Sequence, residues 1–298
     1  MAKVSFITSL YNCLPLTQEM LASLRATLPE DLEHEIIFVD DGSTDGTRDW
    51  LATLPPPCRA ILNERNLGFA ASNNRAARAA TGDLLFFLNN DLVLQPGWFE
   101  PMMLLFTLRD RLGLVGNRQN AHRDGSLDHC GVRFDSLGRP FHDRRRPWWK
   151  TLKRYSRYRA VTAACCAISR EVFLDIGGFD EVYRNGYEDI DLCLRLNVRG
   201  YRNYVANQST VLHHVSASPD RFVKENDNLK EYLRRWGPPF RPPRDPSGRE
   251  LGWSYLSRYW KRPWRYHGLK VALALARIVT NRPCHHLIKR WKLTGATT

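Results

Sequence analysis

The stretch Leu84-Leu85-Phe86-Phe87-Leu88-Asn89-Asn90-Asp91 passes from five apolar residues to three polar ones. An apolar run of this length, preceded by the turn residues Thr81-Gly82-Asp83, is typical of a strand buried on both faces of a parallel sheet. Open α/β sheets bind their ligands just beyond the carboxyl ends of the strands. A carboxylate at such an end can hold a divalent cation, and the cation can hold a diphosphate. Asp91 is therefore the first candidate for a functional residue.

The residues before this stretch alternate between apolar runs and amphipathic segments. Strands are expected at 4–10 and 35–39, and Pro15 is expected to open a helix between them. The chain continues with a helix through Trp50 and Leu51, a strand at 59–62, helices at 70–80 and 98–107, and a strand at 112–116. Strands and helices that alternate through short connections predict an α/β fold with a doubly wound sheet.

The alternation changes after residue 117. Residues 118–159 are polar and rich in Arg, and they predict a hairpin followed by a long, mobile loop. Later segments predict strands at 161–168 and 210–212 and helices at 189–199 and about 221–236. Four prolines within 237–243 then predict a boundary between a domain at 1–236 and a basic helical extension at 237–298.

The extension carries most of the positive charge. The chain has a formal net charge of +13, and residues 236–298 hold thirteen Lys and Arg against two Asp and Glu. Interleaved tryptophans fit either a helix packed on the main domain or an anchor on an anionic membrane surface. The Arg-rich loop 139–159, with Trp148 and Trp149, is a candidate lid over an anionic acceptor. The charge is local and no nucleic-acid-binding motif accompanies it, which disfavours a nucleic-acid partner.

The cysteines indicate a reducing environment. Their number is seven, which is odd, and their spacings fit no zinc site. Several lie in apolar runs, so free buried thiols are expected. The start of the chain has no signal-peptide pattern, and the apolar run 271–279 contains Arg277 and is too short to span a membrane. We therefore expect a cytoplasmic protein. This expectation is compatible with peripheral contact with the inner face of the cell membrane.

Two strand ends before Asp91 also carry polar residues. Asp40 begins the run Asp40-Asp41-Gly42-Ser43-Thr44-Asp45-Gly46, in which Thr44 or Asp45 is a plausible helix cap. Asp40 is either part of this turn or an acceptor for the imide N–H of a nucleobase. Tyr11 follows the first strand and is either a half-buried turn residue or a platform on which a base stacks.

Two later segments carry groups that can do proton or metal chemistry. Gly186-Tyr187-Glu188-Asp189-Ile190-Asp191 places three acids in a first helical turn, where they complement the helix dipole or supply a general base, with Glu188 and Asp189 as candidates. His213-His214 ends the strand at 210–212, and an imidazole there could join Asp91 on a divalent ion. Strand alternation from Val211 favours His213.

Six motifs in the order found here resemble bacterial inverting glycosyltransferases of family 2, which have the GT-A fold, a Rossmann-like mixed sheet. The motifs are residues 4–12, 38–46, 66–69, 88–91, 177–180 and 187–191. The resemblance covers roughly residues 3–235 and is greatest to transferases that build rhamnose- or galactose-containing surface polysaccharides. It implies a nucleotide-diphospho-sugar donor, dTDP- or UDP-linked, and a glycan or lipid-linked acceptor.

The resemblance also implies roles for individual residues. Asp189 matches the catalytic base, beside Glu188, and Asp91 matches the last acid of a metal-binding Asp-x-Asp motif whose first position is Asn89 here. His213 matches a further ligand of Mg²⁺ or Mn²⁺, with His214 as the fallback. The donor-binding residues implied are Ser9, Tyr11, Asp40, Asn66, Gly68, Asn90 and Asp91. The expected activity is transfer of a sugar with inversion; the alternative is a non-catalytic relative that binds glycans or nucleotides as a scaffold.

Overall fold

A computed structural model of the chain describes residues 2–135, 138–144, 153–214, 225–237 and 275. The chain divides into two units, Met1–Pro238 and Pro239–Thr298, and the description that follows concerns the first. The predicted extension at 237–298 lies almost entirely outside the described residues, as do Trp148 and Trp149. Within the described ranges, no helix is long and apolar enough to cross a membrane.

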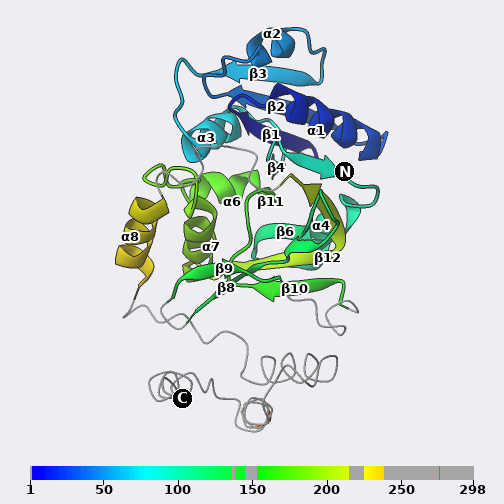
Figure 1. Cartoon of the computed structure of the whole chain (residues 1–298). Coiled ribbons are helices and arrows are strands. Elements are labelled where there is room, and N and C mark those ends of the chain that lie inside the picture. The colour runs from blue at the N-terminus through cyan, green and yellow to red at the C-terminus, as the bar shows by residue number, and fades with distance from the viewer. Residues whose placement is uncertain (1, 136–137, 145–152, 215–224, 238–274, 276–298) are drawn as a thin grey trace, which may run out of the picture. The chain divides into compact units, whose positions relative to one another are not determined.

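The first part of the chain forms the predicted parallel sheet (Figure 1). Strands β1 (Val4–Leu10), β2 (His34–Asp40), β3 (Cys58–Leu62) and β4 (Leu84–Leu88) run parallel in the spatial order β4-β1-β2-β3. Helices α1 (Leu14–Thr27), α2 (Thr47–Ala52) and α3 (Phe69–Ala79) connect them. These elements confirm the predicted alternation to within a few residues, because each strand contains a short run dominated by apolar residues.

Beyond β4 the sheet becomes mixed. Strand β11 (Cys165–Ser169) lies antiparallel to both β4 and β6 (Leu112–Ala121), and β12 (Arg202–His213) runs parallel to β6. The full order is β10-β12-β6-β11-β4-β1-β2-β3, with β10 (Tyr155–Tyr158) at the edge. The expectation that β4 lies within an all-parallel sheet was therefore wrong on one side, while the mixed sheet expected from the family resemblance is confirmed.

Two apolar layers enclose the sheet. Phe86 of β4 packs against Trp98 and Phe99, whereas its neighbour Phe87 packs against Phe173 and Phe179 on the opposite face. Helices α1, α2 and α4 (Glu100–Leu108) contribute to the first layer, and α3, α6 (Arg170–Asp175), α7 (Glu188–Val198) and α8 (Glu225–Trp236) to the second. Burial on both faces explains why β4 is apolar at every position.

The polar part of the chain contains more strand than its composition predicts. The hairpin expected within 118–159 is present as β8 (Val132–Phe134) and β9 (Pro140–His142), and β7 (Leu127–His129) and β10 also lie there. The expected long loop falls partly on residues 145–152, which lie outside the described residues. Strands β6 and β12 extend well beyond their predicted ends. Several of their polar residues, among them Asn117, Gln119, Asn203 and Ser209, are buried, and composition alone does not indicate burial of that kind. The short strand β5 (Leu92–Leu94) was not predicted.

Six cysteines lie among the described residues, and all six are free. Five of them are buried, and Cys13 is partly exposed. This confirms the expected buried thiols for the described part of the chain. Burial raises the pKa values of Cys58, Cys165, Cys166 and Cys193, which keeps them as neutral thiols.

Candidate active site

The loops after β1 and β2 are joined by hydrogen bonds. The backbone N–H of Asn12 donates to Ser43 Oγ at 2.8 Å, and Asn12 Oδ1 accepts the N–H of Thr44 at 2.8 Å. Asp45 accepts the backbone N–H of Leu14 at 2.9 Å. Asn12 and Cys13 adopt left-handed backbone angles, which turn the chain sharply from the strand into α1. The two strand ends therefore form one fixed edge of the sheet.

Asp40 lies fully buried at the end of β2. Its carboxylate accepts the backbone N–H groups of Gly42 and Ser43 at 3.2–3.3 Å and the Nε–H of Arg48 at 2.6 Å. Asp40 thus organises the turn, and its contact with a base stays a prediction. The expected cap of α2 differs in detail: Gly46 occupies the N-cap position, and Asp45 accepts the Thr47 N–H from just outside it.

The neighbouring Asp41 holds the loop that contains Asn66 and Gly68. Its carboxylate accepts the backbone N–H groups of Leu67 at 2.8 Å and Gly68 at 2.9 Å, and the side-chain amide of Asn63 at 2.8 Å. A charged acceptor with three donors fixes this loop strongly. The sequence analysis did not assign Asp41 a role, because its position in the motif gives no sign that its partners lie on a distant loop.

The other residues predicted to bind the donor lie around this edge. Tyr11 is 49% exposed and so presents an open aromatic face. Ser9 Oγ accepts a hydrogen bond from Asn73 of α3 at 3.1 Å. Asn90 donates to Thr17 Oγ1 of α1 at 3.1 Å. These contacts hold Ser9 and Asn90 in place, and their roles toward a donor stay predictions.

Asp91 and His213 meet at the carboxyl end of β4, although 121 residues separate them in the sequence. Pairing of β5 with β12 places His213 opposite Leu92. Asp91 Oδ1 lies 3.1 Å from His213 Nε2, and both side chains are at least nine-tenths buried. The contact does not have hydrogen-bond geometry: Asp91 Oδ1 and both ring nitrogens of His213 are buried and have no hydrogen-bond partner among the residues that the structure describes. Two such acceptor-type atoms that lie side by side suit a shared cation.

The chemistry of this pair fits the expected metal. A carboxylate oxygen and an imidazole nitrogen form a mixed donor set of the kind that Mn²⁺ accepts, whereas Mg²⁺ prefers oxygen ligands. Of the two histidines considered, the structure brings His213 to Asp91 and directs His214 elsewhere, toward Glu19. Partial burial and the nearby carboxylates of Asp45 and Asp91 raise the pKa of the Cys13 thiol, in agreement with a local excess of negative charge at this edge.

The first turn of α7 carries Glu188 and Asp189 toward the same region. Asp189 Oδ2 accepts the backbone N–H of Ala163 at 3.0 Å, and the carbonyl of the next residue, Ala164, accepts the N–H of Asn89 at 2.8 Å. One short segment therefore connects the candidate base to the end of β4. Glu188 is buried and accepts the N–H of Gly186 at 2.6 Å, so it closes its own turn.

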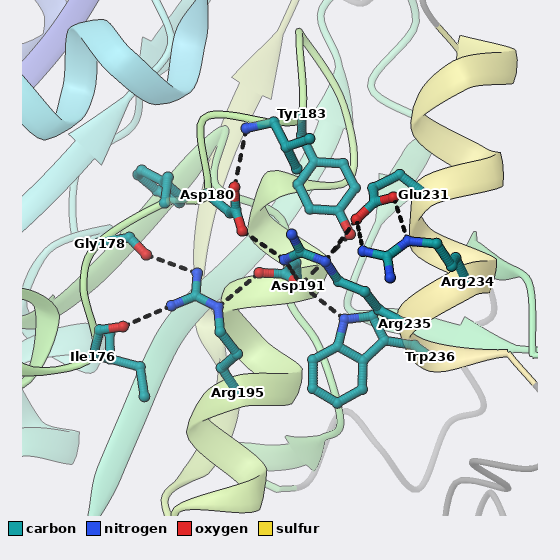
Figure 2. Close-up of polar contacts among 12 residues, drawn as sticks. Ile176, Gly178, Asp180, Tyr183, Asp191, Arg195, Glu231, Arg234, Arg235 and Trp236 are labelled. Carbon is teal, nitrogen blue, oxygen red and sulfur yellow. Dashed lines mark hydrogen bonds and ion pairs between the residues drawn. The ribbon is translucent and has the colours of Figure 1, made fainter.

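The third acid of this turn has a structural role. Asp191 is fully buried and accepts hydrogen bonds from Arg195 Nε at 2.7 Å and Trp236 Nε1 at 2.8 Å (Figure 2). Arg235 of α8 lies 3.5 Å from Asp191 and 2.5 Å from Asp180. This network fastens α8 and the 176–180 loop to α7, and α7 is the helix that carries Asp189.

Residues 5–177, more than half of the chain, match the family described as Glycosyl transferase family 2. The chain belongs to glycosyl transferase family 2. The family inferred from the six motifs is thereby confirmed.

Relatives of this family 2 chain include proteins of polysaccharide synthesis. The chain is 35% identical to the O-antigen biosynthesis protein RfbC of Myxococcus xanthus over 62% of the chain and 15% of RfbC. It is 27% identical to the N-acetylglucosaminyl-diphospho-decaprenol L-rhamnosyltransferase of Mycobacterium tuberculosis over 71% of the chain and 76% of that protein. It is 32% identical to the uncharacterized protein y4gI of Sinorhizobium fredii over 77% of the chain. The chain spans 28% of y4gI and 15% of RfbC, so it corresponds to part of these two larger proteins.

Solved structures show that the family 2 chain has the GT-A fold. GalNAc-T7, in a crystal structure with UDP, GalNAc and Mn²⁺, matches 79% of the chain with a TM-score of 0.65 and 17% identity. The mannosyltransferase PcManGT from Pyrobaculum calidifontis, in complex with GDP-Man and Mn²⁺, matches 99% of the chain with a TM-score of 0.57 and 18% identity. At this identity the likeness concerns the fold, which agrees with the mixed sheet described above.

Several buried polar residues of β6 and β7 were missed by the sequence analysis. Asn117 and Gln119 on β6 and His129 on β7 are each 1% exposed, and each has one side-chain atom without a hydrogen-bond partner in the described ranges. Burial, and the nearby imidazoles of His142 and His213, lower the pKa of His129 well below its ordinary value, so the ring is neutral. The alternation Asn117-x-Gln119 is a signal in the sequence that could have indicated these two residues, since it fits a strand with a polar face.

Proposed function

We propose that this family 2 member is an inverting glycosyltransferase that moves a sugar from a nucleotide-diphospho-sugar to a hydroxyl group. The observation that supports this best is the pair Asp91 and His213 at a strand end. Asp91 Oδ1 and His213 Nε2 are buried 3.1 Å apart, and neither atom has a hydrogen-bond partner within the described part of the chain. A carboxylate that is held beside the same strand end, Asp189, supplies the base that such a reaction needs. Metal-type ligands at one strand end, and a base connected to the same strand end through residues 163–164, suit a donor diphosphate and an acceptor hydroxyl.

Each group has a defined task in this proposal. Tyr11 stacks on the nucleobase, and the loop that Asp41 fixes, with Asn66 and Gly68, contacts the nucleotide. Asp91 and His213 hold Mg²⁺ or Mn²⁺, which supplies positive charge for the departing diphosphate. Asp189 takes the proton of the acceptor hydroxyl as its oxygen attacks the anomeric carbon from the side opposite the leaving group. One displacement of this kind inverts the anomeric carbon.

The relatives suggest the class of acceptor. The name of the mycobacterial relative specifies a sugar linked through a diphosphate to a polyprenol, and RfbC is an O-antigen biosynthesis protein. We infer that the acceptor here is a glycan or a lipid-linked sugar of surface polysaccharide synthesis, with a dTDP- or UDP-linked donor, at the cytoplasmic side of a membrane. Residues 236–298 carry eleven more basic than acidic side chains, and such an excess of positive charge suits an anionic membrane surface.

Metal-dependent stabilisation by one nucleoside diphosphate is the expected result of a thermal shift experiment with UDP, dTDP, GDP and CDP. Each is tested with Mn²⁺, with Mg²⁺ and with EDTA. A ligand at about 100 times its Kd stabilises the folded state by about 2.7 kcal/mol, which corresponds to a rise in Tm of about 5–10 °C. Asp91→Ala should lose the metal-dependent part of this shift, since one of two ligands is gone.

The matched control is Asp110→Ala, an exposed acid just before β6 at the opposite edge of the sheet, which should respond like the wild type. Unchanged metal dependence in Asp91→Ala would contradict the role of Asp91. Absence of any shift in the wild type would favour the non-catalytic scaffold instead.

Removal of residues 253–298 should release the protein from vesicles that contain anionic phospholipid. The deletion removes most of the local positive charge and four tryptophans, the groups that bind such a surface. Co-sedimentation of both proteins is measured at low and high salt, with vesicles of neutral lipid as the control. A truncated protein that still sediments with anionic vesicles would show that the extension is not the anchor.

A further inference from the structure

A second cluster of metal-type side chains lies next to the Asp91–His213 pair. It consists of Glu19 on α1, His122 just after β6 and His214 just after β12. One carboxylate oxygen and one nitrogen from each imidazole all lie within 4.8 Å of one another. Across the described part of the chain, no other group of three His, Cys, Asp or Glu residues brings its ligand atoms so close.

The carboxylate of Glu19 contacts both imidazoles, one through each oxygen. His214 Nε2 lies 3.1 Å from Oε2, and His122 Nε2 lies 4.0 Å from Oε1. The two rings stack with centroids 3.9 Å apart and an angle of 24° between their planes. Glu19 and His122 are exposed and His214 is partly exposed, so a cation can reach them from solvent.

Backbone hydrogen bonds fix two of these residues to the sheet. The N–H of His122 donates to the carbonyl of His213 at 2.9 Å, and the N–H of His214 donates to the carbonyl of Asp91 at 2.9 Å. Pairing of Ala121 with His213 aligns the ends of β6 and β12. The helix that carries Glu19 is in turn linked to the end of β4 through Thr17 and Asn90. Three elements therefore hold the cluster together without an ion, which reduces the ordering that binding requires.

We propose that Glu19, His122 and His214 form a second cation site, for a zinc-type transition metal ion, distinct from the Asp91–His213 pair. Two imidazole nitrogens and one carboxylate oxygen are a ligand set that Zn²⁺ and Co²⁺ bind with tetrahedral geometry and a free fourth position. Mg²⁺ and Ca²⁺ prefer all-oxygen sites, so they compete poorly. An ion at this site restricts His214, whose neighbour His213 belongs to the first pair.

The site can be tested with Co²⁺ alone, because tetrahedral Co²⁺ absorbs visible light and replaces Zn²⁺ in such ligand sets. Untagged full-length protein is titrated with Co²⁺, and affinity and stoichiometry are followed by absorption and calorimetry. His122→Ala and His214→Ala are expected to lower the affinity of one Co²⁺ ion by about tenfold or more and to remove its visible band. Both side chains are accessible to solvent, so the variants are expected to fold, and their melting curves check this.

Two further variants separate this site from the other candidates. Asp91→Ala/His213→Ala removes the first pair and should still bind one Co²⁺ ion with the visible band. His285→Ala/His286→Ala removes the other adjacent histidine pair of the sequence and should bind like the wild type. The proposal is overturned if His122→Ala and His214→Ala bind Co²⁺ as the wild type does, or if the band disappears in Asp91→Ala/His213→Ala while its melting curve stays cooperative.

Discussion

Asp189→Asn is expected to lower the rate of sugar transfer by about 10²–10⁴-fold while donor binding remains unchanged. The substituted amide keeps the shape of the side chain, and its one oxygen can still accept the N–H of Ala163, so the link from α7 to residues 163–164 should remain. The N–H of Ile190, which Asp189 Oδ1 accepts at 2.8 Å, loses this acceptor. An amide cannot take a proton from the acceptor hydroxyl, and the loss should therefore fall on kcat. The decrease is large because proton removal accompanies the formation of the new bond.

The measurement is release of nucleoside diphosphate during sugar transfer. The donor is a nucleotide sugar of the nucleoside diphosphate that stabilises the protein in the thermal shift experiment, and the acceptor is a polyprenyl-diphosphate-linked N-acetylglucosamine. The control is Asp175→Asn, the same chemical change at the exposed end of α6, where Asp175 pairs with Arg199. It should retain wild-type turnover. If Asp189→Asn does the same, another group is the base, and Glu188→Gln becomes the next variant to measure.

Asp191→Asn is expected to destabilise the fold by about 3–5 kcal/mol, the usual cost of breaking a buried ion pair from one side. Asp191 is fully buried and accepts from Arg195 and Trp236, with Arg235 close by. An asparagine at this position would direct an N–H₂ group toward guanidinium donors and leave Arg195 with uncompensated charge. Urea unfolding at constant m-value should report the loss of stability, together with a fall in Tm of about 6–20 °C.

Asp175→Asn is a matched control for this variant too, because both acids pair with an arginine of the α7 region and differ in burial. Asp175 is 66% exposed, so its loss should cost about 0–1 kcal/mol. Trp236→Phe removes a single hydrogen bond from the network and should cost about 1 kcal/mol plus any lost packing. A stability of Asp191→Asn within about 1 kcal/mol of the wild type would show that the network contributes little.

The parallel half of the sheet could be predicted because its signal is local. Strands β1, β2 and β4 are largely buried on both faces, so apolar residues dominate each of them, and polar residues follow at the carboxyl end of each strand. The other half has no such signal. Strands β6 and β12 bury Asn117, Gln119 and Ser209, residues that are typical of loops, and only pairing with distant strands keeps them extended.

The residues of the candidate site likewise fall into those that a local sequence pattern indicates and those whose roles depend on the tertiary structure. A carboxylate after an apolar strand indicates a ligand site, and this local pattern is enough to select Asp91. The three acids at the start of α7 look alike in the sequence, yet Asp191 is the buried centre of the ion-pair network, while Asp189 is connected through Ala163 and Ala164 to the end of β4. Their different surroundings come from α8 and from the loop at 162–164, both remote in sequence.

The sequence by itself determined the family, the parallel strands and the acids at their ends, because apolar periodicity and motif order are properties of contiguous residues. Only the tertiary structure decided that His213 lies beside Asp91 and that His214 joins Glu19 and His122. Those neighbours depend on the register of β12 against β5 and β6. Register is set by pairing between strands that are far apart in the chain, and a shift by one residue would exchange the two histidines.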